Sequence, residues 1–249
     1  MPSFSDHFQF HTTNHAPYYI VSPNFIQKSA GPRTLHYLCH TLNELGYEAY
    51  ITSEICNPWL RTPKLTQEIK ETHKKTNRTP IVIYPEIVHG NPLDEVIVVR
   101  WLLNKAGLLG GSNTHTPNEL IFHWDEWVLS GEETQGRLFL PNVDERIFNS
   151  EGVIDSERLG FCYYAHKYLL SGGKISERIT KNGISLCQNI PYSPEEIANV
   201  LRSTKVLYCY EPSNIIHEAH ACGCSIVLIE SDYLDNFDIK SSEIPLTKE

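Results

Sequence analysis

The chain of 249 residues has 30 acidic and 21 basic side chains, a formal net charge of -9, and 41% hydrophobic residues. This composition is typical of a globular protein with one large or two small domains, and it excludes a disordered or fibrous chain. The acidic balance argues against nucleic acid as the main partner, because binding to a phosphate backbone needs clustered Lys and Arg. The one basic run, "KETHKKTNR" at 70–78, is interpreted as a solvated helix end.

The seven cysteines are odd in number and lie mostly inside apolar runs. This pattern predicts buried thiols in a reducing compartment rather than a disulfide framework. Cys222 and Cys224 lack the spacing and the second pair of a zinc ribbon, so we expect no metal. We find neither a leader pattern nor an apolar run long enough to cross a bilayer. We therefore expect a cytoplasmic protein, a location compatible with peripheral contact at the inner face of the membrane.

The first half of the chain predicts alternating strands and helices. "YYIVSP" at 18–23 is a buried strand, a leucine-periodic helix begins near Pro32 and ends at Gly46, and "YEAYIT" at 47–52 is the next strand. Strand, helix and strand in this order predict a crossover unit with parallel pairing. A helix is expected near 65–77, with further strands at 79–86, 95–104, 118–124 and 136–143.

A second series begins near residue 158. Strands are expected at 159–168, 183–188, 205–210 and 225–229, and helices at 193–204 and 213–222. Ser193 is the expected N-cap of the first of these helices, with Pro194 in its first turn. The polar segment 144–157 is interpreted as a linker. The prediction is therefore an α/β protein with domains at 1–148 and 156–249.

One junction in the second domain predicts a ligand site. Within 207–229 an apolar strand leads into a helix that opens with Ser213 and Asn214, and Glu218 follows one to two turns later. Backbone N–H groups at a helix start favour an anion, and a nearby carboxylate accepts hydrogen bonds from hydroxyl groups. Phosphate and ribose together make a nucleotide. The alternative is that Ser213 only caps the helix and Glu218 is a surface charge.

This junction resembles the donor-binding signature of glycosyltransferases with the GT-B fold, which has two Rossmann-like domains. In that family the second glutamate of a spaced pair binds the ribose of a nucleotide sugar, and the helix start binds its diphosphate. The resemblance assigns these roles to Glu218 and to Ser213 with Asn214, and makes Glu211 the first glutamate of the pair. Six residues separate Glu211 from Glu218, one fewer than retaining members commonly have.

The first half is similar to bacterial glycosyltransferases of lipopolysaccharide and capsule biosynthesis, over 22–52 and 84–107. The resemblance covers most of the chain and implies a GT-B-like pair of domains, the C-terminal one short or truncated. It implies transfer of a sugar from a nucleotide-diphosphate donor to a surface-polysaccharide or lipid-linked acceptor, without a metal or other cofactor. Ser29, Gly31 and Arg33 would form a loop and first helical turn on the acceptor side, facing the interdomain cleft.

Three further residues are candidates for catalysis. The resemblance places Lys167 opposite the donor diphosphate, where its charge would stabilise the leaving group. Glu86 and His89 follow a predicted strand, at the edge where open α/β sheets bind ligands, and either could act as a general base. Each also has a purely structural interpretation: Lys167 as a lysine at a strand end that points into water, and Glu86 and His89 as ordinary loop residues. His36 and His40 lie four residues apart, but no third metal ligand accompanies them, so packing and surface roles are preferred.

Two other functions are weighed against the transferase. The first is a transferase-like nucleotide- or sugar-binding module without catalysis, since the chain is short for the fold and ends soon after 225–229. The second is another Rossmann-type enzyme, such as a nucleotide-sugar epimerase, which needs a glycine-rich dinucleotide loop. No GxGxxG, GxSxG or phosphate-loop motif occurs, and neither does the Asp-x-Asp of metal-dependent glycosyltransferases.

Overall fold

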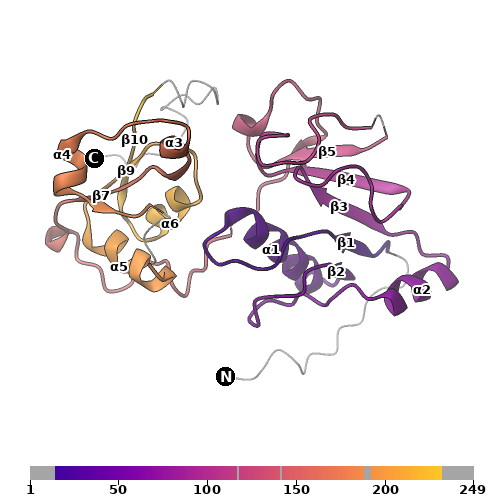
Figure 1. Cartoon of the computed structure of the whole chain (residues 1–249). Coiled ribbons are helices and arrows are strands. Elements are labelled where there is room, and N and C mark those ends of the chain that lie inside the picture. The colour runs from indigo at the N-terminus through magenta and orange to yellow at the C-terminus, as the bar shows by residue number, and fades with distance from the viewer. Residues whose placement is uncertain (1–14, 117, 141, 188–191, 232–249) are drawn as a thin grey trace. The chain divides into compact units, whose positions relative to one another are not determined.

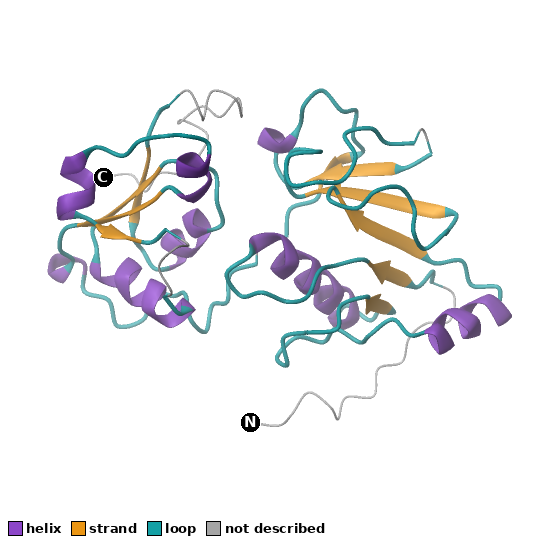
Figure 2. Ribbon diagram, in the orientation of Figure 1, coloured by secondary structure: helices purple, strands orange, loops and turns teal. Residues whose placement is uncertain are grey.

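The computed structural model describes residues 15–116, 118–140, 142–187 and 192–231 (Figure 1). The chain divides into two compact units, Met1–Leu140 and Pro141–Glu249. Each unit has its own β-sheet with helices around it, as Figure 2 shows in orange and purple. The neighbouring strands of both sheets are parallel, so the α/β class with two Rossmann-like units that the sequence predicts is confirmed at this level.

The first unit contains a six-stranded sheet in the order β2-β1-β3-β4-β5-β6. Its strands are β1 Tyr18–Ile20, β2 Ala49–Ile51, β3 Ile81–Pro85, β4 Ile97–Leu102, β5 Leu120–His123 and β6 Gly136–Arg137. Its helices are α1 Ala30–Glu44, α2 Gln67–Lys75 and the short 3-10 helix η2 Glu126–Val128. The expected strand at 136–143 was too long, because among its described residues only Gly136 and Arg137 pair with β5.

Alternate residues of the strands feed two apolar cores. Ile20 and its register partners Ile51 and Ile83 pack with the leucine face of α1. Tyr19 packs on the other side with Ile69 of α2. This alternation follows from the two-residue period of a strand, and it places one helix on each face of the sheet. The predicted leucine-periodic helix is therefore confirmed.

The second unit contains a four-stranded sheet in the order β10-β9-β7-β8. Its strands are β7 Phe161–Tyr164, β8 Ile184–Ser185, β9 Val206–Cys209 and β10 Ser225–Leu228. Its helices are α3 His166–Leu170, α4 Glu177–Asn182, α5 Pro194–Ser203, α6 Ile215–Ala221 and the 3-10 helix η3 Asp155–Glu157. Ser193 caps α5 as predicted: its side chain accepts from the Glu196 amide, and the Glu196 carboxylate accepts from the Ser193 amide.

Several features of the second unit differ from the sequence-based prediction. Helix α4 was not predicted, and of the described residues in the strand expected at 183–188 only Ile184 and Ser185 pair with β7. The expected strand at 159–168 ends at Tyr164, and the chain turns at Ala165 into the helix α3. The expected linker at 144–157 belongs to the unit itself, because Phe148 is buried in its core. The chain divides between residues 140 and 141, ahead of the boundary expected from polarity.

All seven cysteines are free thiols, and six of them are buried. The first unit holds Cys39 and the half-buried Cys56, and the second unit holds the other five. The Thr204 hydroxyl lies 3.4 Å from the Cys162 sulfur and 3.7 Å from the Cys224 sulfur. The prediction of buried thiols is thus confirmed for all but Cys56. No helix in the described parts of the chain is long and apolar enough to cross a membrane.

Candidate functional site

Adjacent parallel strands bring two of the predicted site segments together in the second unit. β7 and β9 pair in register, with Tyr164 opposite Cys209, so the segments that follow them leave the same edge of the sheet. The Tyr210 amide donates to the Tyr164 carbonyl over 3.0 Å, and the rings of Tyr168 and Tyr210 stack with centroids 5.2 Å apart. The start of α3 and the segment after β9 therefore lie side by side.

Glu211 joins these two segments from inside the unit. Its Oε2 accepts a hydrogen bond of 2.7 Å from the Tyr168 amide, and the residue has no exposed surface. Burial raises the pKa of this carboxyl, while the Tyr168 amide and the charge of Lys167 act in the opposite direction. The sequence assigns Glu211 to donor binding, whereas its visible role is to anchor the start of α3.

Glu218 and Asn214 form a hydrogen-bonded pair on α6. Asn214 occupies the N-cap position but makes no side-chain cap bond there. Its Nδ2 instead donates to Glu218 Oε1 over 2.9 Å, and Glu218 is almost fully buried. Asn214 thus stands at the start of α6 without capping it through its side chain. Ser213 precedes the pair, and its carbonyl accepts from the Ile216 amide at 3.1 Å.

Lys167 lies in α3 rather than at the end of a strand. The helix has five residues, and the side chain of Lys167 is half-buried. Burial raises the pKa of the Glu211 carboxyl, and the charge of Lys167 acts against that rise. The structure thus brings Lys167, Glu211, Ser213, Asn214 and Glu218 to the carboxyl edge of one four-stranded sheet, the edge on which such sheets bind ligands.

Glu86 and His89 lie on the turn after β3 in the first unit. The Glu86 carboxylate accepts a hydrogen bond of 2.9 Å from the Leu103 amide and is almost fully buried. His89, three residues later, is exposed. Glu86 therefore ties the end of β3 to the end of β4, and of the two predicted bases it is His89 that faces solvent.

A buried arginine holds the turn after β3 in place. No sequence pattern marks this residue. Arg100 of β4 donates to the carbonyls of Val88 and Gly90, both at 2.8 Å, and to Glu119 Oε2 at 2.9 Å. Its guanidinium also lies 5.1 Å from the centroid of the Tyr84 ring. The position of His89 is consequently fixed from within the sheet.

The predicted acceptor-side residues begin α1. Ser29 is at the N-cap position without a side-chain cap bond, and Gly31 and Arg33 belong to the first turn. Gly31 has open space around the position of a Cβ atom. Arg33 is only 5% exposed, so the alternative of a first-turn surface residue does not apply to it. Of the three residues, Ser29 and Gly31 are the more accessible.

His36 and His40 make separate contacts although they lie four residues apart. His36 Nε2 is 3.2 Å from the Pro23 carbonyl and 3.1 Å from the Ser53 hydroxyl, and burial lowers its pKa. His40 Nδ1 accepts from the Arg61 amide. Among the described residues no group of three His, Cys, Asp or Glu side chains could hold a metal ion.

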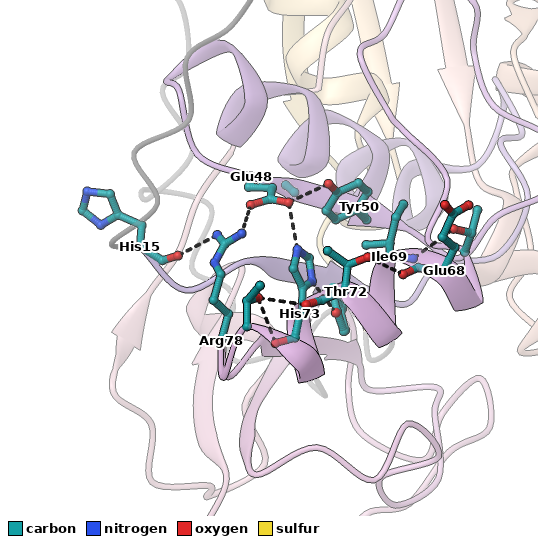
Figure 3. Close-up of polar contacts among 12 residues, drawn as sticks. His15, Glu48, Tyr50, Glu68, Ile69, Thr72, His73 and Arg78 are labelled. Carbon is teal, nitrogen blue, oxygen red and sulfur yellow. Dashed lines mark hydrogen bonds and ion pairs between the residues drawn. The ribbon is translucent and has the colours of Figure 1, made fainter.

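The first unit also contains a polar network that the sequence did not predict (Figure 3). His73 Nε2 lies 2.9 Å from Glu48 Oε1 and its Nδ1 lies 2.6 Å from the Tyr19 hydroxyl. Glu48 also accepts from the Tyr50 hydroxyl at 2.6 Å and pairs with Arg78 at 2.5 Å. The run 70–78 is thus not simply a solvated helix end, because His73 is buried and Arg78 is half-buried.

The Glu48 carboxylate is the acceptor on which the network converges. Because the Glu48 carboxylate can only accept, His73 Nε2–H donates to it; when the ring is neutral, Nδ1 then accepts from the Tyr19 hydroxyl. Burial alone raises the pKa of Glu48, but the hydrogen bonds from Tyr50, His73 and Arg78 outweigh it and leave the pKa below its usual value. Burial likewise raises the pKa of Tyr19 to about 12. The network fastens α2 to the strands.

Glu48→Gln is expected to remove part of the acid sensitivity of the first unit. A carboxyl whose pKa is lowered on folding contributes stability above its unfolded pKa, and this stability is lost as the pH falls through the folded pKa. The melting temperature of the parent should therefore decrease once the pH drops below about 4.5, which is close to the pKa of an unfolded glutamate. The melting temperature of the variant should decrease less steeply. Glu44→Gln, an exposed acid on α1, is the control. Parallel profiles for parent and Glu48→Gln would contradict the assignment.

A depression of about 450 Å³ lies beside this network. It is lined by Asn43, Glu48, Tyr50, Arg61, Thr62 and Pro63. None of the residues predicted from the sequence lines it. Asn43 donates to the carbonyls of Cys39 and Ala49, and Glu48 is committed to its three donors. The polar groups here serve the fold, so we assign the candidate site to the carboxyl edges of the sheets.

No protein-family model matches the chain, and a search of curated proteins gives no match.

Proposed function

We propose that the protein is a GT-B-type glycosyltransferase, which moves a sugar from a nucleotide-diphosphate donor to a surface-polysaccharide or lipid-linked acceptor. The observation that carries this proposal is the edge formed by β7 and β9, where the start of α3, Glu211 and α6 lie together. A nucleotide diphosphate is bound by three kinds of group: a cation, a pair of polar residues before a helix, and a carboxylate one turn later.

The donor is assigned to the second unit. Glu218 would accept hydrogen bonds from the ribose hydroxyls, with Asn214 holding its carboxylate in place. Ser213 and Asn214 precede α6 and would lie near the phosphates, and Lys167 would face the diphosphate as it leaves. Glu211 would hold the start of α3, and with it Lys167, in place by accepting a hydrogen bond from the Tyr168 amide. The chemistry needs no metal ion, because the lysine charge stabilises the leaving group.

The acceptor is assigned to the first unit. His89 is the exposed candidate for a general base, and Ser29 and Gly31 would lie along the acceptor. Saccharide hydroxyls are the groups such a base would activate. Arg100 would then act as a positioning residue, since it holds the carbonyls on both sides of His89.

Glu218→Ala is expected to weaken binding of a nucleotide sugar about tenfold or more, since hydrogen bonds to a charged group contribute roughly 1.5–3 kcal/mol. Calorimetry with nucleoside diphosphates and nucleotide sugars measures this directly. Glu218→Gln retains an acceptor for Asn214 and should lie between parent and alanine variant. Glu195→Ala, on the exposed start of α5, is the matched control. If a folded Glu218→Ala variant binds as tightly as the parent, Glu218 does not contact the donor.

The alternative is a nucleotide- or sugar-binding module without catalysis. The Glu86 contact favours it, because a carboxylate engaged by the Leu103 amide is poorly placed to act as a base. The two functions differ in one measurement. Nucleotide binding without donor hydrolysis or transfer, tested with a panel of nucleotide sugars and saccharide acceptors, would favour the module.

A further inference from the structure

The outer edge of β2 is covered by two different parts of the chain. The Asn43 side chain donates to the Ala49 carbonyl at 2.9 Å and accepts from the Ala49 amide at 3.4 Å. Two residues later the Ile51 amide donates to the Pro63 carbonyl at 2.9 Å, and the Ile51 carbonyl accepts from the Leu65 amide at 2.7 Å. The backbone groups that Ala49 and Ile51 direct to this edge are therefore paired, which closes this part of the edge to a further strand.

The depression of about 450 Å³ lies where these two covers meet, and we call it the β2 depression. Asn43 from one cover and Pro63 from the other both line it. Its volume is within the range of small-molecule sites, about 300–1,000 Å³. Another lining residue, Glu48, directly precedes β2, so the β2 depression lies toward the amino ends of the strands. It is thus separate from the carboxyl edge assigned to catalysis.

Arg61 is the lining residue with donors left for a ligand. The fold already uses the polar groups of Asn43 and Glu48. The side chain of Arg61 is 25% exposed, and its Nη1 lies 3.9 Å from Glu44 Oε1, which is beyond hydrogen-bond distance. This long ion pair leaves the guanidinium N–H groups able to donate to a ligand. Thr62, the next residue, adds a half-buried hydroxyl to the lining.

Tyr50 and Pro63 add apolar surface beside this guanidinium. The Tyr50 hydroxyl is used within the polar network, so its contribution to the β2 depression is its ring, which lies 5.9 Å from the His73 ring between centroids (Figure 3). The Arg61 amide donates to His40 Nδ1 at 3.0 Å, which fixes the backbone on the other side. Groups that are held before binding lose little freedom when a ligand arrives.

We propose that the β2 depression binds a neutral saccharide unit. A pyranose carries hydroxyl groups around its rim and C–H groups on its faces, so the Arg61 fork suits adjacent hydroxyls and the Tyr50 ring suits a face. An acidic ligand fits less well, because Arg61 is balanced by Glu44, and Glu48 is paired with Arg78. On a polysaccharide, this site would hold a sugar distant from any unit that reacts. The inference stands independently of the proposed transferase activity, since it concerns binding at the other end of the strands.

Saturation-transfer NMR with the full chain tests this site. The probes are dextran and the methyl glycosides of glucose, galactose and mannose, and the C–H protons of at least one should receive saturation from the parent. Arg61→Ala should weaken that binding about tenfold, the loss expected for a hydrogen bond to a charged group. Arg61→Lys keeps the charge without the fork and should also bind more weakly. Arg137→Ala is the matched control, because this half-exposed arginine lies on β6 at the opposite edge of the same sheet.

His89→Ala separates the β2 depression from the acceptor site proposed above. Saccharide binding that survives His89→Ala and falls in folded Arg61→Ala supports the proposal, even if no nucleotide sugar is ever turned over. Binding that is lost in His89→Ala and kept in both Arg61 variants overturns it and assigns the saccharide to the acceptor site. Absence of saccharide binding by the parent overturns it as well. Binding of glucuronate or phosphate through Arg61, without the neutral glycosides, would show an anion site instead.

Discussion

Arg100→Leu is expected to lower the free energy of unfolding by about 3–5 kcal/mol, the usual loss when one partner of a buried ion pair is removed. The variant leaves the Glu119 carboxylate buried without its guanidinium and frees the carbonyls of Val88 and Gly90. Urea titration followed by circular dichroism measures the change. The turn that carries His89 should also become accessible to protease.

Two comparisons make this expectation specific. Arg137→Ala removes a half-exposed pair with Asp125 together with a hydrogen bond to the Trp124 carbonyl, and should change stability less, by about 1–2 kcal/mol. The double variant Arg100→Leu with Glu119→Leu removes both charges and should recover part of the loss, because no carboxylate is left buried alone. Equal losses in Arg100→Leu and Arg137→Ala would show that the buried arginine does not hold the turn.

Lys167→Ala is expected to lower turnover about a hundredfold while it weakens donor binding much less. A cation opposite the departing diphosphate interacts more strongly as the bond breaks, so its removal acts on the transition state. Turnover and donor affinity are measured in parallel by product formation and calorimetry. Lys181→Ala, which removes an exposed partner of Glu177 on α4, is the control. Comparable turnover in Lys167→Ala and the parent would exclude the catalytic role.

Local chemistry made part of the fold predictable. Helix α5 begins with Ser193 and Pro194, and Glu196 completes the capping box, so its start could be placed from residues that are neighbours in the chain. The leucines of α1 repeat at helical spacing, and the described strands are short apolar runs. These signals depend on contacts within a few residues. They are visible without knowledge of the tertiary structure.

The missed features depend on partners far away in the sequence. The segment that contains Lys167 follows an apolar strand directly, and no local residue pattern marks the start of a helix there. The helix begins where the Tyr168 amide donates a hydrogen bond to Glu211, which lies 43 residues further along the chain. Likewise, the run 70–78 is polar by composition, but His73 is buried and forms a hydrogen bond with Glu48, which precedes β2. No local pattern encodes such pairings. The sequence could predict that the carboxyl edge of the sheet is a ligand site. It could not predict which carboxylates at that edge would form hydrogen bonds within the protein.

The distribution of cysteines makes the opening of each unit separately measurable. Cys39 is the one fully buried thiol of the first unit, and burial raises its pKa well above the usual range, while the five thiols of the second unit are buried as well. A thiolate forms, and an alkylating reagent reaches it, only after the surrounding structure opens. Timed alkylation followed by peptide mass spectrometry would therefore report two opening rates from one unmodified chain, without any engineered probe.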